Sequence, residues 1–98
     1  MAKLTTVYWR DIPAQVIAKE RRDTAKIVLT ERFAEAIDKA AMRAKMAGTD
    51  AYLEQWRREV AKCGKDLQAA VDEAASKLEQ DFDDARLKSL VSNGGNAG

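Results

Sequence analysis

The sequence VYWRDIPAQ, residues 7–15, decides how this chain folds. It joins two large aromatic residues, an Arg-Asp pair and the only proline of the chain at the end of a stretch with the composition of a β-strand. Tyr8 and Trp9 are adjacent, and successive side chains of a strand point to opposite faces of a sheet. Only one of the two rings can therefore enter the core of a sheet that is covered on one side. The other ring needs a covering helix or a binding partner.

Three short strands are predicted around this stretch. Residues 4–9, 15–19 and 24–29 are rich in Thr, Val, Ile and aromatic residues, or alternate apolar with polar side chains. The first connection contains Pro13, which cannot donate to a strand ladder, and the second runs over the charged residues 20–23. The sequence therefore predicts a three-stranded antiparallel meander.

A first helix is predicted after the meander. Thr30 offers a hydroxyl as N-cap, and apolar residues then recur every three or four positions over residues 33–44. Much of this stripe is alanine, so the element that packs on it can approach closely. Gly48 suits the left-handed position that ends a helix, and Thr49 or Asp50 can cap the next helix directly.

Two further helices complete the predicted architecture. The second has apolar residues along one side over residues 52–60 and ends or kinks at Gly64. The third runs over about residues 65–85, with its apolar residues in a narrow arc. Three apolar residues leave that arc, namely Leu87, Leu90 and Val91. Either the helix breaks near Asp83 and the last segment folds back onto the sheet, or this segment docks on a partner.

These elements predict one α+β domain over residues 1–91, a three-stranded antiparallel meander followed by two or three helices packed on it. At 98 residues, the chain can bury one core but is too small for a deep two-lobed active site. The last segment, SNGGNAG at residues 92–98, is low in apolar residues and is expected to be a flexible tail.

Charge and composition narrow the classes of function. The formal net charge is +1, but residues 1–29 carry six Lys and Arg against three acids, whereas residues 65–91 carry four against seven. This asymmetry suits recognition of a protein partner and falls short of the strongly basic composition of nucleic-acid-binding domains. The single cysteine, Cys63, favours a reducing cytoplasm. The sequence has no signal-like apolar start and no stretch of about 18 apolar residues, so neither secretion nor membrane spanning is expected.

The sequence lacks the residues and motifs that most often carry catalysis. Without histidine it has no imidazole base and no histidine-based zinc site, and one cysteine excludes CxxC motifs. No GxxxxGK or GxGxxG loop is present for nucleotide phosphates. The acidic run over residues 79–84 lacks the turn glycine of a calcium loop and reads as a solvated face. We therefore predict no catalytic residue, no metal site and no cofactor.

Three strings of the sequence resemble the small bacterial domain family known as "virulence factor": YWRDIPAQV at residues 8–16, FAEAIDKAAMRAKMAGTDAYLEQWRR at residues 33–58 and DDARLKSLV at residues 83–91. The family name records a phenotype and implies no chemistry. The resemblance implies a module that occurs alone or fused to scaffold-like and helical-repeat segments. It also implies genes for folate-linked one-carbon enzymes nearby, including methylenetetrahydrofolate reductase and corrinoid methyltransferase components. Residues 19–23 depart most from the family pattern, so no function is assigned there.

We predict a non-catalytic accessory or adaptor protein that binds a cytoplasmic bacterial enzyme, with the enzymes of that neighbourhood as expected partners. The residues expected to bind the partner are Tyr8, Trp9, Arg10, Asp11, Gln15, Arg43, Trp56, Arg57, Leu87, Leu90 and Val91. A first alternative is a subunit that contributes charged residues to a folate or phosphate site in a shared active site. The residues expected to bind that anion are Arg10, Arg43, Asp50 and Arg57. A second alternative is weak nucleic-acid binding through the basic N-terminal third and its aromatic residues.

Overall fold

The structure of the chain, a computed structural model, describes residues 2–46, 48 and 50–96. Its elements follow in the order β1 (Lys3–Trp9), β2 (Ile12–Glu20), β3 (Asp23–Val28), α1 (Glu31–Arg43), α2 (Asp50–Glu54), β4 (Trp56–Lys62), α3 (Leu67–Asp81) and α4 (Asp84–Ser92). Over the described residues, the strands form one antiparallel sheet in the order β3-β2-β1-β4. The α+β class is as predicted, but the sheet has a fourth strand that the sequence analysis did not predict.

The first three strands form the predicted antiparallel meander. Two residues separate each pair of strands, and each turn begins with an arginine in the left-handed region, Arg10 or Arg21, at a φ of 54°. Positive φ in a two-residue turn matches the right-handed twist of the strands that it joins. Strand β2 begins at Ile12, earlier than predicted, so Pro13 lies inside the strand rather than in the connection. The register with β1 shifts beside Pro13, as expected for a residue that cannot donate to the ladder.

The predicted helix over residues 52–60 is wrong in its second half. Helix α2 ends at Glu54, and Trp56 begins strand β4, which pairs with β1 from Trp9 opposite Trp56 to Lys3 opposite Lys62. The segment WRREVAK suits a helix by its composition, and its apolar residues, Trp56, Val60 and Ala61, do not alternate with polar ones as in a half-buried strand. Pairing satisfies the backbone groups along the free edge of β1, and this tertiary gain overrides the local helix preference.

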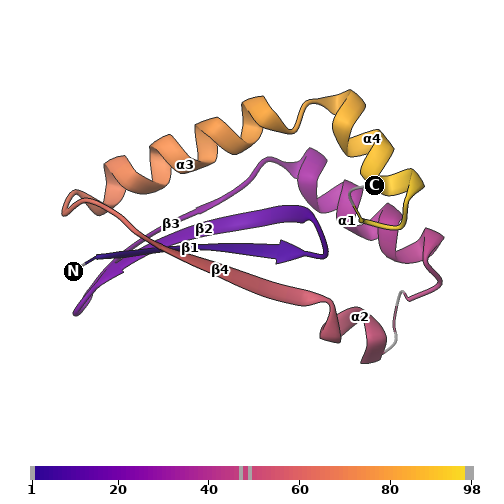
Figure 1. The fold of residues 1–98 in the computed structure, drawn as a ribbon, viewed down its shortest axis with the longest axis horizontal. Coiled ribbons are helices and arrows are strands. Elements are labelled where there is room, and N and C mark those ends of the chain that lie inside the picture. The colour runs from indigo at the N-terminus through magenta and orange to yellow at the C-terminus, as the bar shows by residue number, and fades with distance from the viewer. Residues whose placement is uncertain (1, 47, 49, 97–98) are drawn as a thin grey trace.

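Helices cover one face of the sheet and one of its ends. Helix α3 packs on β2 and β3, while α1 and α4 pack on each other beyond the turn between β1 and β2 (Figure 1). Val16 and Ala18 of β2 are fully buried in the core, and Leu4 and Ile27 border it. The core continues around the end of the sheet to Trp9, which is also fully buried.

The helix predicted from about residue 65 onward breaks where its apolar residues change sides. This is the first of the two predicted alternatives, a break near Asp83. Helix α3 ends at Asp81, and Asp83 caps α4 by accepting a hydrogen bond from the Arg86 backbone N–H at 2.8 Å. Leu87 and Leu90 are buried. The last segment therefore folds back onto its own domain, although it packs mainly on α1 and not on the sheet.

Helix α4 ends in a Schellman motif that brings two glycines into the interior. Gly95 donates to the carbonyl of Leu90 at 2.7 Å and Gly94 donates to that of Val91 at 3.1 Å, with positive φ at both glycines. The carbonyl of Gly95 in turn accepts from the Asp11 backbone N–H at 2.9 Å. Both glycines, which the sequence assigned to the tail, are buried.

Helix α1 also ends in a Schellman motif, but not at the predicted glycine. Lys45, at a φ of 60°, donates to Met42, and Met46 donates to Ala41 at 2.8 Å. Gly48 lies three residues further on, so its prediction as the end of α1 is wrong. Of the two predicted caps of the next helix, Thr49 lies outside the described residues and Asp50 is the first residue of α2.

A carboxylate from α3 holds the start of α1. Thr30 occupies the predicted N-cap position, but its hydroxyl does not cap the helix and donates instead to Glu79 at 3.0 Å. Glu79 also accepts from the Thr30 backbone N–H at 3.0 Å and from Arg32 at 2.9 Å. Burial alone would raise the pKa of Glu79, but these hydrogen bonds outweigh it and lower that pKa below its ordinary value.

We expect Glu79→Ala to lower the free energy of unfolding at pH 7 by about 1–3 kcal/mol, because it removes charge-assisted hydrogen bonds to α1. Since the folded-state pKa is depressed, the stabilisation by Glu79 is present above its unfolded pKa and is lost as the pH falls through the folded pKa. Urea titrations at pH 7 and below pH 4 should therefore show a gap between variant and wild type that shrinks in acid. Glu73→Ala, an exposed change on the same helix, serves as the control. A gap independent of pH would contradict this account.

Candidate functional site

The two faces of the sheet differ in what covers them. Side chains that alternate with Val16 and Ala18 point away from α3, and the strand register aligns them across all four strands. This uncovered surface, which we call the open face, comprises Lys3, Thr5, Val7, Gln15, Ile17, Lys19, Thr24, Lys26, Val28, Trp56, Arg58, Val60 and Lys62. Only at the end near α1 and α2 do helices border it.

Large apolar side chains are exposed on this face. Val28 on one edge strand is 65% exposed, Val60 on the other is 60% exposed, and Trp56 is 36% exposed. Ile17 lies between the edge strands and is partly exposed. Apolar side chains gathered on one face, rather than scattered singly, are typical of an interaction surface.

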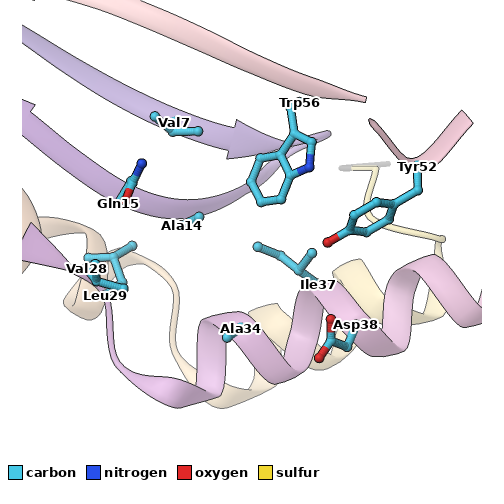
Figure 2. A pocket seen from close by; sticks show the side chains of 10 residues that line it. All are labelled: Val7, Ala14, Gln15, Val28, Leu29, Ala34, Ile37, Asp38, Tyr52 and Trp56. Atoms are coloured by element: carbon cyan, nitrogen blue, oxygen red, sulfur yellow. The ribbon is translucent and has the colours of Figure 1, made fainter. Parts of the chain in front are cut away.

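A cleft of about 230 Å³ opens at the end of the open face, between the sheet, α1 and α2. Figure 2 shows Trp56 reaching from the sheet toward Tyr52 of α2, with Ile37 and Asp38 of α1 on the opposite wall. The remaining lining is mostly aliphatic: Val7, Ala14, Gln15, Val28, Leu29 and Ala34. The cleft thus combines an apolar interior with a few polar groups at its walls.

Two shallower hollows extend the cleft in opposite directions. One shares Val7, Gln15 and Trp56 with it and reaches Arg58 on the open face. The other shares Asp38 and Tyr52 with it and reaches Met42, which is 60% exposed. We call the cleft and its two extensions the groove. It runs from the middle of the sheet over Trp56 to Met42, near the C-terminal end of α1.

Aromatic packing fixes the wall of the groove. The indole N–H of Trp9 donates to the Tyr52 carbonyl at 2.9 Å, and the Trp9 and Tyr52 rings lie 5.5 Å apart. Tyr52 meets Trp56 edge-to-face at 6.1 Å. Burial, and then the nearby charge of Asp38, raise the pKa of Tyr52. Trp9 therefore supports, from inside the domain, the aromatic wall formed by Tyr52 and Trp56.

Arg10 joins four parts of the chain. Its guanidinium donates to Gln55 at 3.2 Å, to the Gly94 carbonyl at 3.0 Å and to the Met46 sulfur at 3.1 Å, and it lies 5.3 Å from the centre of the Trp9 ring. Each of its three nitrogens thus donates within the domain. This geometry makes Arg10 a structural clamp.

Arg57, Tyr8 and Asp11 lie together on the opposite face of the sheet. Arg57 stacks on Tyr8 with 4.5 Å to the ring centre, donates to the Arg10 carbonyl at 2.8 Å and forms ion pairs with Asp11, at 3.2 Å, and with Glu59. The hydrogen bond with Glu59 is the main cause that raises the pKa of Arg57. Burial, followed by the charge of Glu59, raises the pKa of Tyr8. All three side chains are therefore engaged with one another.

The other predicted site residues are dispersed. Arg43 lies at the end of α1 and donates to the Ser92 carbonyl at 3.3 Å, and Asp50 is exposed at the start of α2. Leu87 and Leu90 are buried and Val91 is partly buried. Of the predicted partner-binding residues, Gln15 and Trp56 line the cleft, and Arg57 contributes to the hollow that reaches Arg58. Trp9 lies directly behind the cleft.

Sequence reasoning missed most of the open face. Val28, Val60 and the surrounding lysines carry no motif, and they share a surface only through the register of strands that are distant in sequence. The segment WRREVAK at residues 56–62 offers no clear strand signal, because its apolar residues do not alternate with polar ones. Tyr52, Trp56 and Val60 instead recur with the four-residue spacing of a helix.

Membrane-spanning and metal-binding features are absent from the described part of the chain. There, no helix is long and apolar enough to span a membrane, and no group of three or more Cys, Asp or Glu side chains could hold a metal ion.

Comparison with known proteins gives one match. The family described as "Virulence factor" matches residues 7–91, which include the open face from Val7 onward and the whole groove. No curated protein and no solved structure matches the chain.

Proposed function

Because the chain belongs to the virulence factor family, whose name specifies no reaction, we propose from its surface that it is a non-catalytic adaptor that binds a protein partner. The observation that carries this proposal is the gathering of Val28, Trp56 and Val60 on one uncovered face of the sheet, beside a groove. An isolated domain gains nothing from exposing them together. A partner that covered them would bury apolar surface worth roughly 25 cal/mol per Å².

The size of the cleft favours a protein side chain over a free cofactor. Pockets for small ligands usually measure about 300–1,000 Å³ and enclose most of the ligand. The cleft measures about 230 Å³ and opens along the sheet into further hollows. Such a shape suits one anchor side chain of a larger partner, whose remaining surface would lie on the open face.

Trp56 is the centre of the proposed interface. Tryptophan, tyrosine and arginine dominate the energetics of protein interfaces. Here Trp56 lies between Tyr52 and Arg58 and belongs to both the cleft and the adjoining hollow. Its ring is also held in place by Tyr52, so binding requires little additional ordering.

The proposed partner is a bacterial enzyme in the cytoplasm. The resemblance described above implies a neighbourhood of folate-linked one-carbon metabolism, and we therefore propose methylenetetrahydrofolate reductase and corrinoid methyltransferase components as the first candidates. The lone Cys63 supports a reducing compartment.

The alternative of a folate or phosphate site receives less support. Such a site would need the guanidinium groups of Arg10 and Arg57 to be free to bind the anion. The first already donates through all three guanidinium nitrogens, and the second is paired with Asp11 and Glu59. An incoming anion would have to displace these partners.

We expect Trp56→Ala to weaken partner binding at least tenfold, about 1.4 kcal/mol, while the domain stays folded. The tagged wild type and the variant are used to capture partners from a bacterial lysate, and the bound proteins are identified by mass spectrometry. Leu53→Ala is the control, because Leu53 is 65% exposed yet does not line the groove. A protein retained by wild type and control but lost by the variant supports the proposal. Equal retention by all three would refute it.

A further inference from the structure

We infer that the surface of the partner is acidic around an apolar centre; this inference rests on the proposed function and specifies the chemistry of the partner. The open face carries five cations, Lys3, Lys19, Lys26, Arg58 and Lys62. All five are exposed. None of the ion pairs found among the described residues involves any of them.

The register places these cations against one another. Lys3 lies directly opposite Lys19 on one side and Lys62 on the other, so three lysines form a row across three strands. Like charges on directly opposite residues destabilise a sheet. The fold gains nothing from this arrangement by itself, whereas an anionic partner would convert the repulsion into attraction.

Acidic side chains are missing from this face over the described strands. Glu20, Asp23 and Glu59 alternate with the open-face residues and therefore belong to the opposite face of the sheet, and Asp38 is on α1 across the cleft. Two further rows lie next to the lysine row, and each is apolar or uncharged except at one edge. The first row runs from Lys26 through Ile17 and Thr5 to Val60, and the second runs from Val28 through Gln15 and Val7 to Arg58. The complementary surface is therefore apolar at its centre and acidic at its rim.

Two other occupants fit this face less well. A second copy of the chain joined face to face would bring lysines against lysines, because a two-fold interface pairs the same patch with itself. Single-stranded nucleic acid is usually held by several exposed aromatic platforms in addition to cations. On the open face, Trp56 is the aromatic side chain that the structure shows exposed.

The test uses two synthetic amphipathic peptides with the same leucines, one with glutamate and one with lysine at every polar position. We expect the full-length protein to bind the glutamate peptide at least tenfold more tightly in fluorescence anisotropy, and to lose at least about fivefold of this affinity between 50 and 500 mM NaCl. The double variant K26E/R58E should bind the glutamate peptide at least tenfold more weakly than the wild type. The control K39E/K88E makes the same change in net charge on exposed residues of α1 and α4, which line a hollow that contains no open-face residue, and should lose less than about twofold.

Four results would overturn the inference. Equal binding of both peptides, or equal losses in both double variants, would show that the face does not select anions by its own cations. Tighter binding of an oligothymidylate through Lys26 and Arg58 would make the face a nucleic-acid surface. Salt-sensitive self-association of the wild type, lost in K26E/R58E, would identify a second copy as the occupant. If the charge test fails while Trp56→Ala still loses its captured protein, the adaptor function stands and only the acidic partner is refuted.

Discussion

Trp9→Ala should lower the free energy of unfolding by about 3–5 kcal/mol, the usual loss for deleting a buried tryptophan. The ring is fully buried, packs against Tyr52 and Arg10, and donates to the Tyr52 carbonyl. Its removal would leave a cavity among β1, α2 and the end of α4, and would free a backbone carbonyl that needs a new partner. Because small domains have only about 5–15 kcal/mol of stability, this loss removes a large share of it, and the variant should unfold at a clearly lower temperature than the wild type.

The cross-strand neighbour provides a matched control. Trp56 is directly opposite Trp9 in the register, but its side chain is at the surface of the groove. Urea unfolding followed by circular dichroism should therefore show a large loss for Trp9→Ala and a loss below about 1 kcal/mol for Trp56→Ala. Equal losses would mean that both rings belong to the core and that Trp56 is not free to bind a partner.

Gly95→Ala should lower the free energy of unfolding by about 2–4 kcal/mol, the sum of a backbone and a packing contribution. A methyl group at this position would lie 2.7 Å from the Trp9 ring, and Gly95 has a φ of 98°, a conformation that alanine rarely adopts. Strain in the backbone contributes about 1 kcal/mol or more, and forcing an extra carbon into a packed interior contributes about 1–3 kcal/mol. The Schellman motif of α4 would have to move away from β1.

Two other glycines separate these contributions. Gly48 has a φ of 76°, but a methyl group added there would meet nothing within 4 Å, so Gly48→Ala should cost only the backbone strain, about 1 kcal/mol. Gly64 has neither restriction, and Gly64→Ala should be close to neutral. Thermal unfolding should rank the losses Gly95, Gly48, Gly64. A Gly95→Ala variant as stable as Gly48→Ala would show that α4 does not press its end against Trp9.

Local patterns in the sequence predict much of the fold. The meander follows from strand composition and α1 from its apolar spacing, while the change of side at Leu87 correctly indicates a break near Asp83. Strand β4 could not be predicted in this way. Its apolar residues keep the four-residue spacing of a helix, and the strand forms because it can pair with the edge of β1, which lies about 50 residues away in sequence.

The candidate site could be predicted only in part, for a related reason. The alternation of side chains along a strand correctly separates Tyr8 from Trp9, and the structure places Trp9 in the core and Tyr8 under the Arg57 guanidinium. The same argument cannot say which surface residues come together, because that depends on strand register. Lys3, Lys26 and Lys62 come to share one surface only after all four strands have paired, because Lys26 and Lys62 lie on the two edge strands.

The late position of β4 in the chain has a consequence for the order of folding. β1 and β2 are joined by a two-residue turn and can pair early, whereas β1 and β4 must close a loop of some 50 residues, which is slower because more chain entropy is lost. Trp56, Arg58 and Val60 all arrive with that last strand. A nascent or partly folded chain would hold the meander yet lack half of the proposed binding surface. Recruitment of the partner would thus be restricted to molecules that have finished folding.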